Sequence, residues 1–190
     1  MVERQLTPLK GIVEVDEAYV GGKPRHGTGP HKRGRGTKKA PIVVLVERDG
    51  SARCKPVENV TAKTLKAEIR DTVDSKSTIM TDEYQVYTGI GKEFEGGHRV
   101  IKHRNKEYSR TDADGTPVNT NTAESFFSLI KRGHMGVYHV MSKKHLHRYC
   151  TEFAFRWDRR KVSDKARMED AMRGIEGKRL LYQTPDQQEN

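Results

Sequence analysis

Three carboxylates and one lysine are the side chains best placed by type to do chemistry in this sequence: Asp16, Asp82, Glu124 and Lys131. Carboxylates that lie close together raise one another's pKa unless cations neutralise them, and carboxylate oxygens are the ligands that Mg²⁺ prefers in proteins. Two Mg²⁺ ions about 3.5–4 Å apart on such ligands support in-line displacement at phosphorus. One ion polarises the attacking water or 3′-hydroxyl and the other stabilises the leaving oxygen, with Mn²⁺ as the alternative metal.

Asp16 lies in a strand predicted over residues 12–20, where apolar and charged residues alternate through the first half. Val13 and Val15 share one face of this strand, and Glu14 and Asp16 share the other. Two carboxylates on one pleated face are costly unless a cation neutralises them. The alternative is an edge strand whose acidic face is solvated.

Asp82 directly follows a short apolar strand predicted over residues 77–81. A carboxylate at the carboxyl end of a strand in an α/β protein lies where active sites gather. The alternative is that Asp82 caps the short helix predicted over residues 83–88.

Glu124 and Lys131 belong to a helix predicted over residues 119–133, with N-cap candidates at residues 119–122 and a stop at Gly133. Its apolar stripe has the spacing i, i+3, i+4, i+7 and consists of Ala123, Phe126, Phe127 and Ile130. Glu124, Ser128 and Lys131 repeat at i, i+4, i+7 beside that stripe, so they line one margin of the buried face. An ordinary amphipathic helix with a solvated charged margin would show the same pattern.

A basic stretch over residues 21–39 follows the first strand and has almost nothing to bury. Its cations are Lys23, Arg25, Lys32, Arg33, Arg35, Lys38 and Lys39. We expect a mobile loop that contacts DNA phosphate, with a merely solvated loop as the alternative. Its glycines do not have the spacing of a nucleotide-binding P-loop.

The remaining elements alternate strands with helices. They are strands over residues 41–48 and 52–58 joined by a hairpin turn at Asp49-Gly50, a helix from Thr61 to Val73, a strand over residues 98–103, a polar loop over 105–116 and a helix over 142–161. Within the last helix, Glu152, Arg156 and Arg159 have the spacing i, i+4, i+7. This triad is either a surface ion-pair ladder or a set of phosphate contacts.

Composition limits the possible partners. The 190 residues include 36 Lys and Arg against 26 Asp and Glu, a formal charge of +10 with a pI near 9.6, which favours a polyanionic partner. Cys54 and Cys150 are too far apart for a zinc motif, and His145 and His147 face different sides of a helix. The sequence contains no apolar run long enough for a membrane span, so we expect a cytoplasmic protein. Residues 162–190 are charged, then rich in Gln, Pro and Asp, and predict a flexible tail.

The order of elements predicts a way to assemble the site. If the strand of Asp16 neighbours the strand of Asp82 in the sheet, the two carboxylates meet, and the helix of Glu124 can lie across them. The predicted fold is therefore α/β, a mixed five-stranded sheet flanked by helices with a C-terminal helical extension.

Four segments in this order resemble bacterial insertion-sequence DDE transposases with a ribonuclease-H-like, retroviral-integrase-type catalytic domain. They are Val-Asp-Glu-Ala-Tyr-Val-Gly-Gly-Lys at 15–23, Thr-Asp-Glu-Tyr at 81–84, Asn-Thr-Asn-Thr-Ala-Glu-Ser-Phe-Phe-Ser-Leu-Ile-Lys-Arg-Gly at 119–133, and His-Leu-His-Arg-Tyr-Cys-Thr-Glu-Phe-Ala-Phe-Arg-Trp-Asp-Arg-Arg at 145–160. The resemblance covers residues 11–161, which we take as the catalytic domain. It is to the branch whose complete members carry a zinc-ribbon or helix-turn-helix region ahead of that domain.

The resemblance implies Mg²⁺-dependent strand cleavage and strand transfer at insertion-sequence ends, by a homo-oligomer on DNA at the nucleoid. Asp16, Asp82 and Glu124 then act as the catalytic carboxylates, two metal ions bind per site, and Lys131 binds phosphate near the scissile bond. Some members are described with Asn at the third position, so Asn119 and Asn121 remain alternatives to Glu124. The DNA-binding residues expected are Lys23, Lys32, Arg33, Arg35, Lys131, Arg132, Arg156 and Arg159.

This chain departs from the family at its start, because Met1 stands only 15 residues before Asp16. We expect the end-recognition region to be missing. Two other functions remain open. One is a ribonuclease-H-type or junction-resolving nuclease, which would have less reason for Lys131. The other is an inactive, basic DNA-binding remnant of a transposase.

Overall fold

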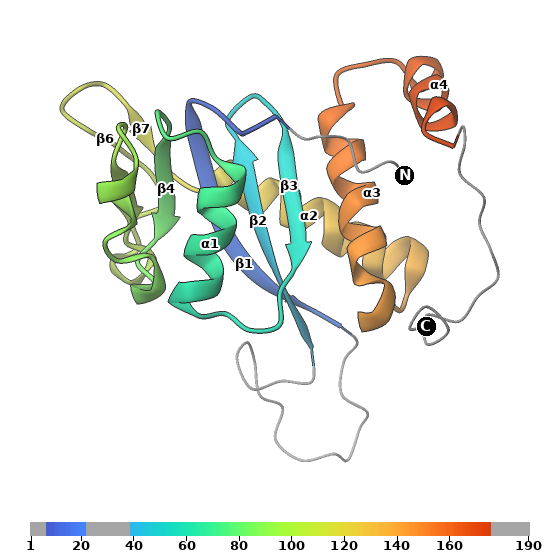
Figure 1. Cartoon of the computed structure of the whole chain (residues 1–190), viewed down its shortest axis with the longest axis horizontal. Helices are drawn as coiled ribbons and strands as arrows, with labels where there is room; N and C mark the ends of the chain where they lie inside the picture. Colours follow the sequence, from blue (N-terminus) through green and yellow to red (C-terminus); the bar gives the residue numbers. More distant parts are fainter. Residues whose placement is uncertain (1–6, 22–38, 176–190) are drawn as a thin grey trace, which may run out of the picture.

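A five-stranded mixed sheet forms the centre of the protein in the computed structural model, which describes residues 7–21 and 39–175 (Figure 1). The strands lie in the order β3-β2-β1-β4-β5. Their bounds are Ile12–Val20 for β1, Ala40–Glu47 for β2, Ala52–Pro56 for β3, Thr78–Asp82 for β4 and His98–Ile101 for β5. This confirms the predicted α/β fold, and it places β1 next to β4.

The register of β1 decides which side chains meet. β1 runs antiparallel to β2 and parallel to β4, where Val13 pairs with Ile79 and Glu14 with Met80. Antiparallel β2 and β3 are joined by the predicted hairpin turn, in which Asp49 has a φ of 63°. The fifth strand is shorter than expected and ends at Ile101.

Helix α1, Ala62–Thr72, covers one face of the sheet. Thr61 caps it as predicted, since its Oγ1 accepts the Thr64 N–H at 3.3 Å. Leu65 and Ile69 are fully buried against apolar side chains of β1, β2 and β4. Burial of this face fixes α1 to the sheet because each such side chain contributes roughly 1.5–3 kcal/mol when removed from water.

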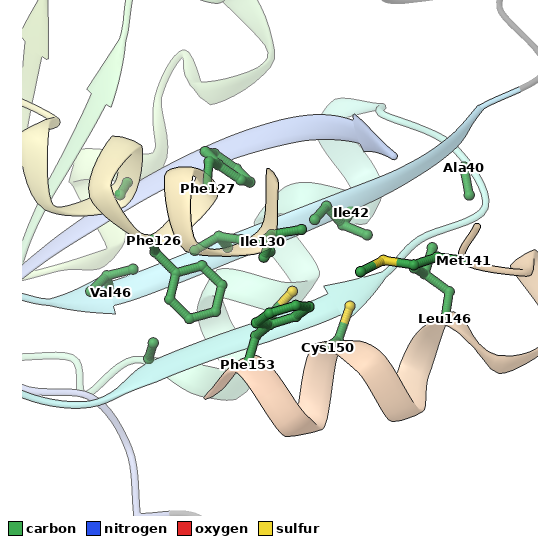
Figure 2. Close-up of a cluster of buried hydrophobic side chains, with 14 residues drawn as sticks. Ala40, Ile42, Val46, Phe126, Phe127, Ile130, Met141, Leu146, Cys150 and Phe153 are labelled. Carbon is green, nitrogen blue, oxygen red and sulfur yellow. The ribbon is translucent and has the colours of Figure 1, made fainter. Parts of the chain in front are cut away.

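Helices α2, Asn121–Gly133, and α3, Leu146–Asp158, pack on the other face, with α3 along β3 (Figure 2). The predicted apolar stripe of α2 is the buried face observed, at Ala123, Phe126, Phe127 and Ile130. In α3 the buried residues are Leu146, Cys150 and Phe153, and Trp157 packs edge-on against Phe126 with ring centroids 5.5 Å apart. The sequence therefore identified the core face of α2.

Helix α2 ends at Gly133, the residue predicted as its stop, but the glycine does not end the helical path of the chain. Its φ of −63° is helical, and the chain continues into a π-helical turn over His134–Tyr138. The ring of Phe153 lies where a Cβ at position 133 would be, so this glycine permits close approach of α2 and α3. The sequence shows a glycine, but not which of its two uses applies.

Residues 105–116, predicted as a polar loop, contain part of a small hairpin. Its strands are β6, Arg110–Thr111, and β7, Pro117–Val118. Arg99 of β5 pairs with Asp112 at 2.9 Å. The hairpin was missed because its strands are only two residues long. Four 3-10 turns complete the described connections, at Gln85–Tyr87, Ile90–Glu93, His103–Asn105 and Lys143–His145.

The chain after α3 begins with a further helix, α4, Asp164–Arg173. Ser163 caps it, and Asp170 binds Arg159 of the preceding turn at 2.7 Å. The helical extension expected from the sequence is therefore present, although residues 176–190 lie outside the described residues. Across the described part of the chain, no helix combines the length and apolar character needed to cross a membrane.

Candidate active site

Asp16 and Asp82 lie side by side at one end of the sheet. In the parallel pair of β1 and β4, Glu14 lies opposite Met80. Continued for two more residues, this parallel register would bring Asp16 opposite Asp82, and the charge of Asp82 is one of the causes that raise the pKa of Asp16. Neighbouring strands are about 4.8 Å apart, which is close enough for two carboxylates to repel each other strongly.

Glu124 approaches the same two carboxylates from the first turn of α2. Its proximity appears in the titration of Asp16. Burial, the charge of adjacent Glu17 and then the charges of Asp82 and Glu124 raise the pKa of Asp16 to about 7, against a partial offset from the Glu17 N–H. Burial also raises the pKa of Asp82, with a further contribution from Glu83. The charges of Asp82 and Glu124 are therefore near enough to Asp16 to affect its titration.

The side chains do not, however, form a ready-made metal cluster. Within the described ranges, no three His, Cys, Asp or Glu side chains are placed to hold one ion. Glu124 is turned outward, 56% exposed, with Oε1 3.9 Å from Nε2 of His103. The donors present are carboxylate oxygens, as Mg²⁺ requires. Asp16 forms no ion pair with a described residue. Because its pKa is raised and no cationic side chain neutralises it, this carboxylate is suited to binding a cation.

The N-terminus of α2 is held by a carboxylate that sequence reasoning had placed among the candidates for a cation, Glu14. This side chain is fully buried. Its Oε2 accepts the backbone N–H groups of Thr122 at 2.7 Å and Ala123 at 3.0 Å, and its Oε1 accepts the Thr122 hydroxyl at 2.9 Å. The N-cap residue is Thr120, within the predicted range, but its side chain makes no capping hydrogen bond, and the helix is capped by Glu14 of β1.

Arg48, just after β2, neutralises Glu14. Its Nε and Nη2 donate to Glu14 Oε1 at 3.0 and 2.8 Å, while Nη1 donates to the carbonyl of Pro117 at 2.7 Å and Nη2 to that of Asn119 at 3.2 Å. The guanidinium therefore binds the backbone of the segment that leads into α2. We call Glu14 and Arg48 the α2 clamp. Arg48 supplies the positive charge that two carboxylates on one face of β1 require, but it pairs with Glu14 and not with Asp16.

The asparagines near Glu124 have different environments. Asn119 Oδ1 accepts the Asn121 N–H at 3.2 Å and lies 3.4 Å from Arg48 Nη2, so this side chain helps to form the turn before α2. Asn121 is exposed at the first position of the helix. Its side chain remains an alternative third ligand.

Two further residues border the site without having been singled out in the sequence. Glu17 points to the opposite face of β1, where its Oε2 accepts the Tyr87 hydroxyl at 2.7 Å, and burial raises its pKa. His103, in the turn after β5, lies beside both Glu124 and the Thr120 hydroxyl. Neither residue had a periodicity or motif that marked it, apart from the adjacency of Glu17 to Asp16.

An open groove of about 530 Å³ adjoins the carboxyl end of β4. It is lined by Glu17, Tyr19, Asp82, Glu83, Tyr84 and Arg104. Asp82 Oδ1 accepts the Tyr84 N–H at 3.0 Å, which orients this carboxylate at the groove wall. Of the three candidate carboxylates, Asp82 is the one that lines this groove.

The predicted DNA-binding cations divide into three groups. Lys131 and Arg132 are exposed in the last turn of α2 and form no ion pair with any residue in the described ranges. Arg156 binds Glu152 at 2.7 Å and Arg159 binds Asp170, so both are engaged within the protein. Lys23, Lys32, Arg33 and Arg35 lie outside the described residues.

Comparison with known proteins places this geometry in context. A family model described as the ISXO2-like transposase domain matches residues 8–158. No curated protein matches the sequence. Among solved structures, the chain is similar to "Mos1 transposase paired-end complex with left transposon end", with 14% sequence identity and a TM-score of 0.35. The match covers 80% of this chain and 54% of that chain, and it is too distant to inform the chemistry.

Proposed function

Because the chain belongs to the ISXO2-like transposase domain family, we propose that it cleaves DNA strands at insertion-sequence ends and joins them to target DNA. What supports this proposal is that β1 and β4, which carry Asp16 and Asp82, are neighbouring parallel strands, and that the charges of Asp82 and Glu124 add to the burial that raises the pKa of Asp16 to about 7. Uncompensated carboxylates beside an open groove are suited to phosphoryl transfer, since the reacting phosphate needs cations between itself and the protein.

Asp16 and Asp82 would hold the metal ions, and Glu124 would complete the set by turning from His103 toward them. Two Mg²⁺ ions, or Mn²⁺ in their place, would supply Lewis acidity at the attacking and leaving oxygens. The protein itself contributes position. Asp16 is fixed by two strands, Asp82 by its bond from the Tyr84 N–H, and Glu124 by the α2 clamp.

Lys131 would bind the DNA backbone beside the reacting phosphate. Seven residues of straight helix turn about 700° and rise about 10.5 Å, so Lys131 lies nearly in line with Glu124 along α2. Arg132 is exposed next to it and would contact the same strand or the next phosphate. The basic stretch over residues 21–39 would add backbone contacts without reading sequence.

Arg156 and Arg159 receive a different role in this proposal. Both are paired within the protein, with Glu152 and Asp170. They would mainly stabilise α3 and the segments next to it, and contact with DNA phosphate would be a secondary role. The protein would act as a homo-oligomer on DNA in the cytoplasm, where the bacterial nucleoid lies.

The test uses the full chain with a duplex carrying the ends of its own insertion sequence, in Mg²⁺ and in EDTA. We expect metal-dependent nicking and joined products, and their loss in Asp16→Asn and in Asp82→Asn with DNA binding largely kept. Full activity in either variant would refute the proposed function. Cleavage without joined products would favour a nuclease.

The third ligand is tested by comparing Glu124→Gln with Asn121→Ala and Asn119→Ala. The proposal expects the largest loss in Glu124→Gln, because only that change removes a charge needed by the metal ions. A larger loss in Asn121→Ala would assign the third position to the asparagine.

A further inference from the structure

The chain between Glu124 and Glu152 contains no Asp or Glu. Its cationic and titratable residues are Lys131, Arg132, Lys143, Lys144 and Arg148, with His134, His139, His145 and His147. All five Lys and Arg residues are exposed. A surface with this sign and no carboxylate of its own suits a polyanion.

Apolar side chains are exposed in the middle of this basic segment. Met135 is 63% exposed, Val137 66% and Val140 70%. We call residues 134–140 the apolar turn. Exposed apolar groups flanked by cations are unusual on a surface that meets only water, because they gain nothing from solvation there.

The apolar turn is not a frayed helix end, since Tyr138 anchors it to α3. The Tyr138 ring packs edge-on against Tyr149 and Phe153, with ring centroids 4.9 and 6.2 Å away. Its hydroxyl donates to Oε2 of Glu152, and Oε1 of Glu152 binds Arg156 at 2.7 Å. The backbone is therefore held while Met135, Val137 and Val140 project into solvent. This gives Glu152 and Arg156 a function: they position the turn.

We infer that the apolar turn is a second DNA-contacting surface, in which Met135 and Val137 pack against base or sugar edges of a duplex while the flanking cations contact phosphate. This rests on the proposed function, since it takes the substrate as duplex DNA. Small apolar side chains set among cations are what groove-binding proteins place against base steps. Charge selects DNA over a second copy of this chain, which carries a net charge of +10.

The helix axis fixes where this contact falls. From Glu124 to Met135 is eleven residues, or about 16 Å along α2 and its continuation. At 3.4 Å per base pair the apolar turn would meet the duplex roughly five base pairs from the scissile phosphate. The contact would lie on the side of Lys131, beyond it.

Salt dependence separates the two kinds of contact. A phosphate contact releases counterions and contributes about −0.9 to the slope of log affinity against log salt, whereas an apolar contact contributes almost none. We therefore propose to measure the affinity of the full chain for a short duplex by fluorescence anisotropy over a range of salt, in EDTA to prevent cleavage.

The test variant carries Met135→Ser and Val137→Ser, and its matched control carries Met168→Ser and Met172→Ser, two comparably exposed apolar residues on α4. We expect the test variant to bind about tenfold more weakly at every salt concentration with the slope unchanged. Lys143→Gln with Arg148→Gln should instead flatten the slope by about two. Unchanged affinity in the test variant, or an equal loss in the control, would refute the inference.

A second pair of variants tests the anchor. Tyr138→Phe removes only the hydroxyl that Glu152 accepts, and Tyr149→Phe is the control because its hydroxyl makes no hydrogen bond in the described part of the chain. Tyr138→Phe should weaken DNA binding severalfold without changing the salt slope, and Tyr149→Phe should not. Equal affinity in both would remove the positioning role of Glu152.

Sedimentation without DNA distinguishes the remaining outcome. If the Met135 and Val137 changes alter the mass of the protein in free solution, the apolar turn is a contact between copies of the chain and the inference is wrong.

Failure of this inference is separable from failure of the proposed function. A chain that cleaves and joins DNA normally, but whose turn variants bind DNA as tightly as the parent, refutes only the inference. A parent chain that binds DNA without cleaving it refutes only the function.

Discussion

Replacing Glu14 by Gln should both destabilise the protein and slow its chemistry, because Glu14 holds α2 and α2 carries Glu124. The side chain is fully buried, and its two oxygens accept bonds from Arg48 and from the first turn of α2. Glutamine has nearly the same shape but no charge. The variant would leave Arg48, whose side chain is only 18% exposed, without its carboxylate.

The size of the loss follows from this burial. Removing one partner of a buried ion pair costs about 3–5 kcal/mol, and the retained shape and amide oxygen of glutamine place this case near 3 kcal/mol. For a chain of this size that corresponds to a fall in Tm of roughly 6–12 °C. Loss of the negative charge at the helix N-terminus acts in the same direction.

Urea unfolding in EDTA, followed by circular dichroism, measures this loss. The control is Glu93→Gln, which makes the same change in the solvent-exposed pair with Arg70 and should barely alter the midpoint. Glu14→Gln combined with Arg48→Gln should lose less than the two single variants together, since removing both charges leaves neither unpaired. A Glu14→Gln variant as stable as Glu93→Gln would refute the clamp.

The effect on chemistry is measured well below the new Tm, so that the folded fraction does not limit the rate. DNA cleavage by Glu14→Gln should be slower than that of the parent even there, whereas cleavage by Glu93→Gln should not change. An unaltered rate would mean that Glu14 supports the fold without positioning Glu124.

Three further predictions concern single positions. Between pH 3.8 and about 7 the folded chain keeps a proton on Asp16, whose pKa is raised, while the unfolded chain releases it. Stability in EDTA should therefore fall as the pH rises through this window, and Asp16→Asn should be the more stable protein at pH 8, as measured by urea unfolding; a parent without this loss would contradict the raised pKa. Lys131→Ala should leave Tm nearly unchanged and yet weaken DNA binding or slow strand transfer, with Lys131→Arg retaining part of the activity; wild-type rates in Lys131→Ala would make the lysine a solvated residue. Gly133→Ala should lower Tm although alanine favours helices, because its methyl group would collide with the Phe153 ring; a rise in Tm would show that α2 and α3 can separate freely.

Periodicity was sufficient to predict most of the fold. The buried stripe of α2 and the inward face of α1 follow directly from apolar spacing, because burial of those side chains is what fixes each helix to the sheet. The β2–β3 hairpin was predicted for a similar reason, since Asp-Gly is compatible with the positive φ found at Asp49. The β6–β7 hairpin was not, because its stability comes from contacts such as Arg99 with Asp112 that are distant in the sequence.

The sequence nominates the residues of the candidate site, but it does not show which side chains support them. Asp16 and Asp82 were identifiable because each stands at a particular place on a strand. Arg48 was not, since nothing local to a residue just after a strand says that its guanidinium will reach Glu14 and the carbonyl of Asn119. The side chain that caps α2 could not be predicted for the same reason, because the carboxylate that accepts its first N–H groups lies more than 100 residues earlier in the chain.

Glu14 and Asp16 show how two carboxylates on one face of one strand can be assigned to different tasks. Glu14 has as many donors as its oxygens can accept, including a guanidinium and two helix N–H groups. Asp16 accepts the N–H of Glu17, and its burial, followed by the charges of neighbouring carboxylates, raises its pKa to about 7. A fully compensated buried acid stabilises the fold, whereas an uncompensated one costs stability and is retained where a cation has to bind. By this criterion Glu14 stabilises the fold and Asp16 is the carboxylate that we propose binds a cation, although the alternation of β1 gives both residues the same pattern in the sequence.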